Sequence, residues 1–177
     1  LLVAPLPVAL FLYDSRDKLT GSHPARLFST DIFTPFLDGG FWRFHTLTNF
    51  YWKNIKAFVS ESSIYLGLSV LAVLVYSYVN TYKKKLVNKD VIFWQVLIVI
   101  FAIFSLGPRL KVFGYSVNHA PMPYVILEKI IPGLKLSGVP IRMMVMVSLG
   151  AAIISSMVLA RVDLTKRRGQ LFMGAFL

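Results

Sequence analysis

The stretch from Met143 to Ala160 reads MMVMVSLGAAIISSMVLA and contains no charged residue. Two similar uncharged blocks precede it, IYLGLSVLAVLVYSYV at Ile64–Val79 and VIFWQVLIVIFAIFSL at Val91–Leu106. With half-polar residues at their ends, such blocks reach the roughly 20 residues that an α-helix needs to cross a bilayer. A single run of this kind is also typical of a buried core helix or strand, but three in one chain favour membrane-spanning helices.

The composition supports the same interpretation. Hydrophobic residues make up 56% of the 177 residues and charged residues only 15%, whereas a soluble domain has less apolar and more charged sequence. A soluble domain would also spread its apolar residues along amphipathic stripes instead of gathering them in blocks. The sequence therefore predicts an all-α fold of polytopic transmembrane helices, with interfacial helices in the external loops.

The blocks define the expected spans. We expect complete spans at about residues 63–81, 91–107 and 142–160, joined in a single membrane region. The apolar segments 1–13 and 170–177 are expected to be parts of further spans, because both ends of the chain look cut. The chain is accordingly expected to be a fragment of a larger membrane protein.

The distribution of Lys and Arg predicts the orientation. The turns 82–90 and 161–169 each carry four basic residues in nine, so the positive-inside rule places them in the cytoplasm. Segments 14–62 and 108–141 are then external. The first is rich in aromatic residues, which settle at the headgroup level, and Pro121–Pro140 is expected to contain a short interfacial helix.

The sequence also excludes several functions. The net charge of +11 is concentrated in clusters beside apolar blocks, as membrane topology requires, so we do not expect nucleic-acid binding. The chain has no cysteine and no local catalytic or nucleotide-binding motif. His23, His45 and His119 lack metal-site spacing and are interpreted as solvated or interfacial. We therefore predict no catalytic residue and no metal ligand in this segment.

Three basic residues are candidates for binding a lipid phosphate. Arg109, Lys111 and Arg142 are all predicted at the external membrane edge, where a guanidinium group can fork onto phosphate oxygens. The alternative is that they neutralise ordinary headgroups, or that Arg142 snorkels from the start of its helix.

Two carboxylates are possible acidic contributors. Asp31 and Glu61 both lie in the first external segment, where an enzyme acting on a lipid-linked substrate needs a base or metal ligand. Asp31 is equally typical of a helix N-cap, because it precedes an apolar run. Glu61 directly precedes the first span and is equally typical of an interfacial charge.

An ordered series of motifs resembles a known superfamily. The motifs are STDIFTPFL at Ser29–Leu37, an acidic residue followed by YLG within Glu61–Gly67, SLGPRLKVFG at Ser105–Gly114, MPYVILEKIIPGLK at Met122–Lys135 and VPIRMMVMVSLGAA at Val139–Ala152. This series resembles the C-terminal half of GT-C-type integral membrane glycosyltransferases related to the dolichyl-phosphate-mannose protein mannosyltransferases. Gly138 stands where such sequences often carry an arginine, so only Arg142 of that pair is present.

The resemblance implies an enzyme that transfers a sugar from a polyprenyl-phosphate carrier to an acceptor at the external face. Its catalytic aspartate would lie outside this chain, and no cofactor is implied within it. The implied partners are the lipid bilayer and a polyprenyl-phosphate-linked sugar, in the cytoplasmic membrane of a prokaryote. The rival interpretation is a non-catalytic membrane protein, either a transporter or a lipid-handling subunit of envelope assembly.

Overall fold

The computed structural model describes residues 10, 25–37, 39, 45–55, 63–83, 88–117, 122–131, 134 and 139–161. The chain forms two compact units. Unit 1 comprises residues 1–64 and 103–143, and unit 2 comprises residues 65–102 and 144–177.

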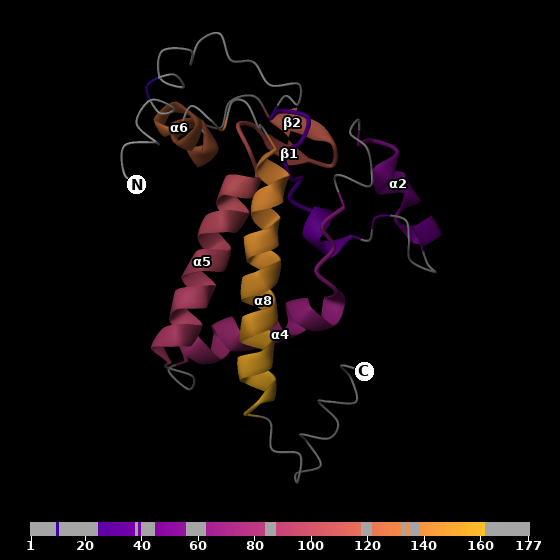
Figure 1. Cartoon of the computed structure of the whole chain (residues 1–177). Coiled ribbons are helices and arrows are strands. Elements are labelled where there is room, and N and C mark those ends of the chain that lie inside the picture. The colour runs from indigo at the N-terminus through magenta and orange to yellow at the C-terminus, as the bar shows by residue number, and fades with distance from the viewer. Residues whose placement is uncertain are drawn as a thin grey trace. The chain divides into compact units, whose positions relative to one another are not determined.

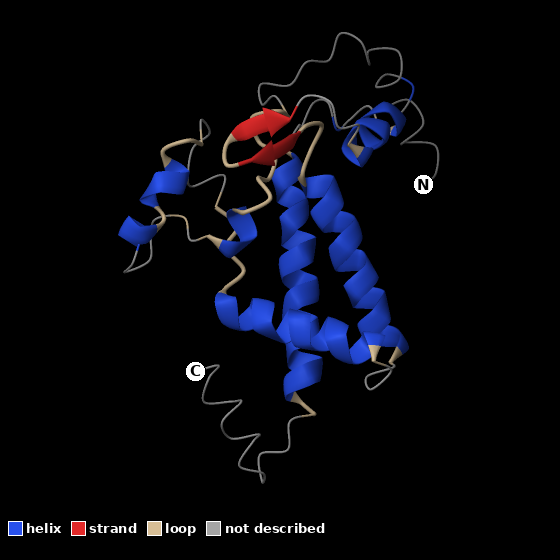
Figure 2. Cartoon of the chain, turned by 180° about the vertical axis from the view of Figure 1, so that it is seen from behind, coloured by secondary structure: helices blue, strands red, loops and turns tan. Residues whose placement is uncertain are grey.

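Unit 2 is built from three helices. They are α4 (Leu68–Tyr82), α5 (Lys89–Ser105, whose last three residues belong to unit 1) and α8 (Met144–Leu159). In Figures 1 and 2, α5 and α8 lie side by side and run in opposite directions, while α4 lies across α8 and packs against it. Lys89 at the start of α5 and Arg161 just after α8 therefore lie at the same end of this antiparallel pair.

Two glycines with positive φ mark helix boundaries. Gly67 has φ +88 and is the N-cap of α4, so the helix begins at Leu68 instead of near residue 63. Gly107 has φ +71, and its N–H donates to the carbonyl of Phe104 at 3.1 Å, which closes the last turn after α5. Glycine adopts this left-handed conformation without the steric cost that a Cβ brings.

A third glycine sets the close packing of α8 on α5. A Cβ added at Gly150 would lie 2.7 Å from Cγ1 of Ile98, well inside contact distance. Val147, about one turn before Gly150, and Ile154, about one turn after it, are also buried. The small residue thus lets the two helices approach, as small residues do between helices in membranes.

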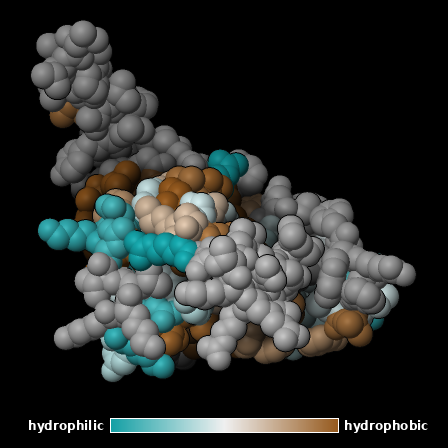
Figure 3. Space-filling view, turned by 90° about the horizontal axis from the view of Figure 1, so that it is seen from below, coloured by the Kyte–Doolittle hydropathy of each residue, from teal (hydrophilic) through white to brown (hydrophobic). Residues whose placement is uncertain are grey.

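The outer surfaces of these helices are apolar as well. Val75, Phe93 and Val145 are more than half exposed. On the face shown in Figure 3, hydrophobic residues form much of the coloured surface, beside a hydrophilic group. A helix that is hydrophobic nearly all round needs apolar surroundings on every side.

Helices α4 and α5 share a buried polar network. The side-chain amide of Gln95 in α5 donates to Oγ of Ser77 at 3.0 Å and to Oγ1 of Thr81 at 3.1 Å. The hydroxyl of Tyr78 donates to the backbone carbonyl of Gln95 at 2.8 Å. The one polar residue within the apolar part of α5 is therefore satisfied by polar residues of α4, as burial requires.

One helix in the described part of the chain is long and apolar enough to cross a membrane. The continuous helix Pro140–Leu159 has 20 residues and a mean hydropathy of 1.9. The other two expected spans coincide with helices of 15 residues (α4) and 17 residues (α5), both shorter than the roughly 20 residues of a typical span.

Unit 1 contains short helical turns and one hairpin. Its elements are η1 (Thr34–Phe36), η2 (His45–Leu47), α2 (Asn49–Trp52), β1 (Leu110–Val112), β2 (Tyr115–Val117), α6 (Pro123–Ile130) and η3 (Pro140–Met143). Strands β1 and β2 pair antiparallel, with Leu110 opposite Val117 and Val112 opposite Tyr115. The described part of the chain is mostly helical, as the sequence predicts, and this short hairpin is an addition that the sequence did not predict.

The hairpin turns at Phe113 and Gly114, which have φ +52 and +79. Two successive positive φ values are the signature of the tight turn that matches strand twist, normally formed by Asn-Gly or Asp-Gly. Phe113 accepts this unfavourable conformation while its ring packs against Phe33, with centroids 4.4 Å apart, and against Tyr51 at 5.7 Å. The aromatic contacts offset the backbone cost, and the sequence FG gave no hairpin signal.

Backbone hydrogen bonds join three distant segments of unit 1. Residues 28–32 run beside the end of α5, β1 and the start of η3. The donors and acceptors are Thr30 N to Ser105 O at 2.9 Å, Ile32 N to Lys111 O at 3.1 Å, and Ile141 N to Phe28 O at 3.1 Å. This arrangement brings the segment that begins at Ala25 against the residues that follow α5.

Candidate functional site

A cavity of about 130 Å³ lies in unit 1 where these segments meet. Its lining residues are Arg26, Leu27, Ser29, Asp31, Thr34, Ile55, Arg109, Lys111, Gly114 and Ser116. We call it the inner cavity. Three of its side chains are cations and one is a carboxylate, so its polar lining carries a net positive charge.

Lys111 on β1 is fixed by backbone carbonyls. Its ammonium donates to the carbonyl of Leu27 at 2.8 Å and to that of Ser29 at 3.4 Å. Partial burial lowers the pKa of Lys111, and the nearby negative charge of Asp31 opposes that shift. The ammonium group is therefore held at one wall of the cavity by the backbone of residues 27 and 29.

Asp31 organises the wall of the inner cavity. The residue is 3% exposed, and its two carboxylate oxygens accept the N–H groups of Gly114 at 2.7 Å and Phe33 at 3.1 Å. The first bond holds the tip of the β1–β2 hairpin, and the second closes a local turn just before the short helix η1. The N-cap of η1 is Phe33 and has no side-chain cap, so Asp31 is not the helix cap that its sequence position favoured. Both oxygens thus serve the backbone.

Tyr51 lies buried behind this wall. Its hydroxyl is 3.2 Å from Oγ1 of Thr34, and its ring contacts Trp52 edge-on. Burial above all, with a smaller effect of the Asp31 charge, raises the pKa of Tyr51. The phenol therefore remains protonated and acts as a structural hydrogen-bonding group.

A second, more open cavity adjoins the first. It has a volume of about 480 Å³ and is lined by Ala25, Arg26, Pro108, Arg109, Val125 and Glu128. We call it the outer cavity. Arg26 and Arg109 line both cavities, so the two spaces meet at these residues.

Helix α6 separates the outer cavity from an exposed apolar surface. Val125 and Glu128 line the cavity, and Tyr124 is buried beside them. Ile126 and Ile130, one turn apart on another face, are 63% and 70% exposed. Burial, followed by the charge of Glu128, raises the pKa of Tyr124 to about 12. The helix is thus amphipathic, with its polar contacts toward the cavity.

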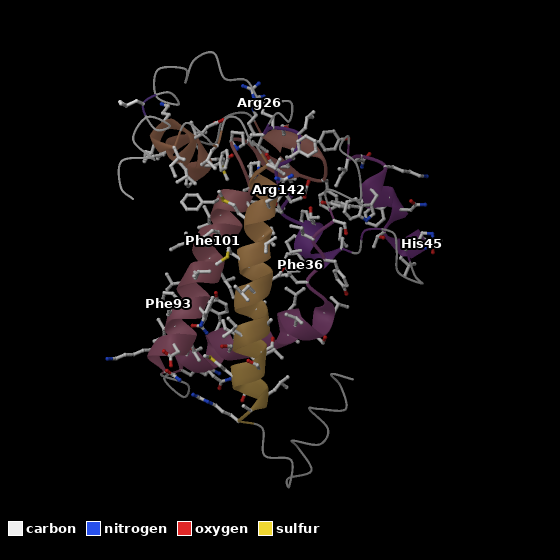
Figure 4. All side chains as sticks on the ribbon, viewed as in Figure 1. Arg26, Phe36, His45, Phe93, Phe101 and Arg142 are labelled. Atoms are coloured by element: carbon white, nitrogen blue, oxygen red, sulfur yellow. The ribbon has the colours of Figure 1, made fainter. Side chains whose placement is uncertain are left out.

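The structure brings together some of the predicted site residues. Arg109, Lys111 and Asp31 line the inner cavity. Arg142 is exposed on η3 and lines neither cavity, and in Figure 4 it is separate from Arg26. Glu61 lies outside the described residues, so its predicted role stays a prediction.

Two cavity residues were missed by sequence reasoning. Arg26 reaches the site because residues 28–32 pair with β1, and Glu128 reaches it because α6 turns that side chain toward the cavity. No local motif marks either residue.

No metal site is formed by the part of the chain that the structure describes. His45 lies on η2, and no group of three or more His, Cys, Asp or Glu side chains comes together there. His23 and His119 lie outside the described residues.

No protein-family model, curated protein or solved structure matches the chain.

Proposed function

We propose that this chain is part of an integral membrane protein that binds the phosphate group of a lipid carrier in the inner cavity. The observation that carries the proposal is the convergence of Arg26, Arg109 and Lys111 on one small space. Guanidinium groups bind phosphate oxygens in a bidentate manner, and an ammonium adds a point charge. Ser29 and Ser116 supply further polar atoms to the same wall.

A polytopic membrane arrangement is the second part of the proposal. It is supported by the length and hydropathy of Pro140–Leu159 and by the apolar outer surfaces of α4 and α5. It is also supported by the antiparallel course of α5 and α8, which leaves Lys89 at the start of α5 and Arg161 just after α8 at the same end of the pair. Basic residues concentrate on the cytoplasmic side of membrane helices.

A lipid phosphate fits this surface better than a free phosphate. Ile126 and Ile130 form an exposed apolar face on α6, whose other face lines the outer cavity. Lys129 lies between them in sequence and is exposed, as suits contact with anionic headgroups. We propose that the isoleucines enter the bilayer, so that a carrier lipid reaches the arginines from the membrane.

Within this proposal, the motif series favours a polyprenyl-phosphate-dependent glycosyltransferase of the GT-C type. Asp31 would not be the catalytic acid, since both of its carboxylate oxygens accept backbone N–H groups. The same observation also favours the second candidate, a lipid-handling protein that performs no chemistry. A transfer assay on the full-length protein with a polyprenyl-phosphate sugar separates the two, because only the enzyme releases the sugar to an acceptor.

Equilibrium binding tests the proposal directly. The probe is a radiolabelled polyprenyl phosphate, added to the purified chain in detergent. Arg26→Ala, Arg109→Ala and Lys111→Met should each weaken binding by about tenfold or more, because each removes a charged hydrogen bond. Arg161→Ala, an exposed arginine far from the cavity in sequence, is the matched control.

Three further results decide whether the proposal stands and which ligand and residues it involves. Binding that is absent, or that is equal in all four variants, overturns it. Displacement by inorganic phosphate as effectively as by the lipid would show that the ligand is free phosphate. Arg142→Ala, measured in parallel, tests the sequence-based hypothesis that Arg142 also contacts the phosphate.

The topology has its own test, which the absence of cysteine makes simple. Single cysteines at Ser116 in the hairpin and at Asn88 before α5 should react with a membrane-impermeant thiol reagent from opposite sides of intact cells or inverted vesicles. Labelling of both positions from the same side would refute the proposed arrangement.

A further inference from the structure

We infer that the open edge of strand β2 binds an extended polypeptide segment that carries an acidic residue between two apolar residues. The acidic side chain enters the inner cavity and competes there with a lipid phosphate for the same cations. The inference goes beyond the proposed function, because it assigns a polypeptide partner and a means by which that partner controls access to the phosphate site.

Strand β2 has one edge without a neighbour in the described part of the chain. Its other edge pairs with β1, where Ser116 lies opposite Lys111. Beyond β1, a single parallel bridge joins Lys111 to Asp31. No further described residue extends this two-stranded sheet, and all three residues of β2 are exposed. An exposed strand edge is a template for pairing with another extended chain.

The register shows which backbone groups face the open edge. The carbonyl of Lys111 accepts the N–H of Ile32 at 3.1 Å, so Lys111 directs its backbone groups away from β2. Lys111 and Ser116 are therefore a non-hydrogen-bonded pair of the antiparallel ladder, in which both residues direct N–H and C=O outward. Ser116 thus presents one donor and one acceptor to an added strand.

The two faces of the hairpin differ in chemical character. Side chains alternate between the faces of a strand, and residues directly opposite each other share a face. Ser116 and Lys111 both line the inner cavity, where two arginines add further positive charge. Tyr115 and Val117 lie on the other face and are 71% and 43% exposed. One face is therefore cationic and the other apolar.

This difference predicts the side chains of the added strand. Its residue opposite Ser116 directs its side chain toward the inner cavity, and the residues on either side of it lie against Tyr115 and Val117. A carboxylate suits the first position, because it forms charge-assisted hydrogen bonds with the cations. Apolar side chains suit the flanking positions. The pattern reads the same in both directions, so it holds for a parallel or an antiparallel strand.

A second copy of this chain fits the edge less well. Its own β2 would place a serine, with no compensating negative charge, opposite Ser116. Each copy also has a net charge of +11, so two copies repel each other. Charge complementarity therefore favours an acidic partner segment.

The test measures fluorescence anisotropy of short labelled peptides that share their flanks and differ only at the centre: Val-Glu-Val, Val-Gln-Val or Glu-Val-Glu. The purified native chain should bind Val-Glu-Val about tenfold more tightly than Val-Gln-Val, because the glutamine cannot form the charged hydrogen bond. Glu-Val-Glu should also bind more weakly than Val-Glu-Val, although it is more acidic, because its carboxylates face Tyr115 and Val117. Tighter binding of Glu-Val-Glu would show attraction by charge alone and overturn the inference.

Variants then assign the binding to the strand edge. Ser116→Pro removes the N–H that faces the edge but no hydrogen bond of the β1–β2 ladder, so it should weaken Val-Glu-Val binding severalfold. Ser116→Ala keeps that N–H and is the matched control, which should bind like the native chain. Equal binding by the proline and alanine variants would contradict strand addition.

Charge variants locate the acidic side chain. Arg109→Ala should reduce the preference for Val-Glu-Val over Val-Gln-Val, because Arg109 lines the inner cavity. Lys53→Met removes an exposed cation after α2 and should leave that preference unchanged. A polyprenyl phosphate should displace Val-Glu-Val from the native chain. Failure to displace it would place the carboxylate outside the cavity and overturn the inference.

The outcomes separate this inference from the proposed function. If a lipid phosphate binds through the arginines but the three peptides bind alike or not at all, this inference alone fails. If the peptides bind in the expected order but no lipid phosphate binds, the proposed function alone fails. If the native chain is a dimer that Ser116→Pro dissociates, the edge is a contact between copies and the inference is overturned.

Discussion

Replacing Asp31 with asparagine should loosen the hairpin that forms one wall of the inner cavity. The carboxylate is 3% exposed and accepts two backbone N–H groups, from Gly114 at 2.7 Å and from Phe33 at 3.1 Å. An asparagine side chain has one oxygen and one NH₂ group, so it can satisfy only one of these donors and presents a donor to the other. Asp31→Asn is therefore a nearly isosteric change that loses one of the two hydrogen bonds and leaves the other without its charge.

The magnitude follows from those two bonds. A hydrogen bond to a charged group contributes roughly 1.5–3 kcal/mol, so Asp31→Asn should lower the free energy of unfolding by about 2 kcal/mol and Asp31→Ala by about twice as much. For a chain of this size, about 2 kcal/mol corresponds to roughly 4–8 °C in Tm. Because the residue is buried, solvent screening does not reduce the estimate.

Two measurements check this prediction. Thermal unfolding of the purified chain gives the Tm, and amide hydrogen exchange shows whether the loss is local, since opening of one region exposes its own amides. Faster exchange should be concentrated in β1, β2 and the turn at Phe113 and Gly114. Asp90→Asn, a change of the same chemistry at an exposed carboxylate, should shift the Tm by far less.

The result also decides between the two interpretations of Asp31 left open by the sequence. If Asp31→Asn melts like Asp90→Asn and leaves hairpin exchange unchanged, the carboxylate does not hold the turn. The result would then favour the other interpretation, in which the Asp31 carboxylate takes part in ligand chemistry. A large, local loss of stability would instead establish Asp31 as the residue that positions the cavity wall.

Three further predictions concern helix packing and titration. Gly150→Ala should lower the Tm, because the added Cβ would lie 2.7 Å from Cγ1 of Ile98. This clash should outweigh the higher helix propensity of alanine, about 1 kcal/mol. A rise in Tm would show that the two helices are less closely packed. Gln95→Leu should destabilise unit 2 by about 1–3 kcal/mol, because the buried hydroxyl of Ser77 loses the hydrogen bond that Gln95 donates to it. In a double-mutant cycle, adding Ser77→Ala should recover part of that loss. The pKa of Tyr124 is raised from 10.0 to about 12, so between these values the folded chain holds a proton that the unfolded chain has lost. The free energy of unfolding should therefore fall as the pH rises through that interval. Tyr124→Phe should lose less stability over the same pH range in the same unfolding assay.

The sequence alone determined the character and approximate position of the helices. The uncharged blocks coincide with α4, α5 and α8, and the expected short helix in Pro121–Pro140 is α6. Hydrophobicity over a long window is a local property, so it is readable without knowledge of contacts. Boundaries were less exact: α4 begins five residues later than expected, because Gly67 takes a positive φ at its start.

Only the tertiary structure decided the hairpin and the composition of the site. Phe113 occupies a turn position that its own preference disfavours, and contacts with Phe33 and Tyr51 compensate for the cost. Arg26 and Arg109 are distant in sequence and share two cavities because backbone pairing near residues 28–32 aligns their segments. Local sequence reports what one segment prefers, whereas convergence of charges depends on which segments pair, and that is a property of the whole folded chain.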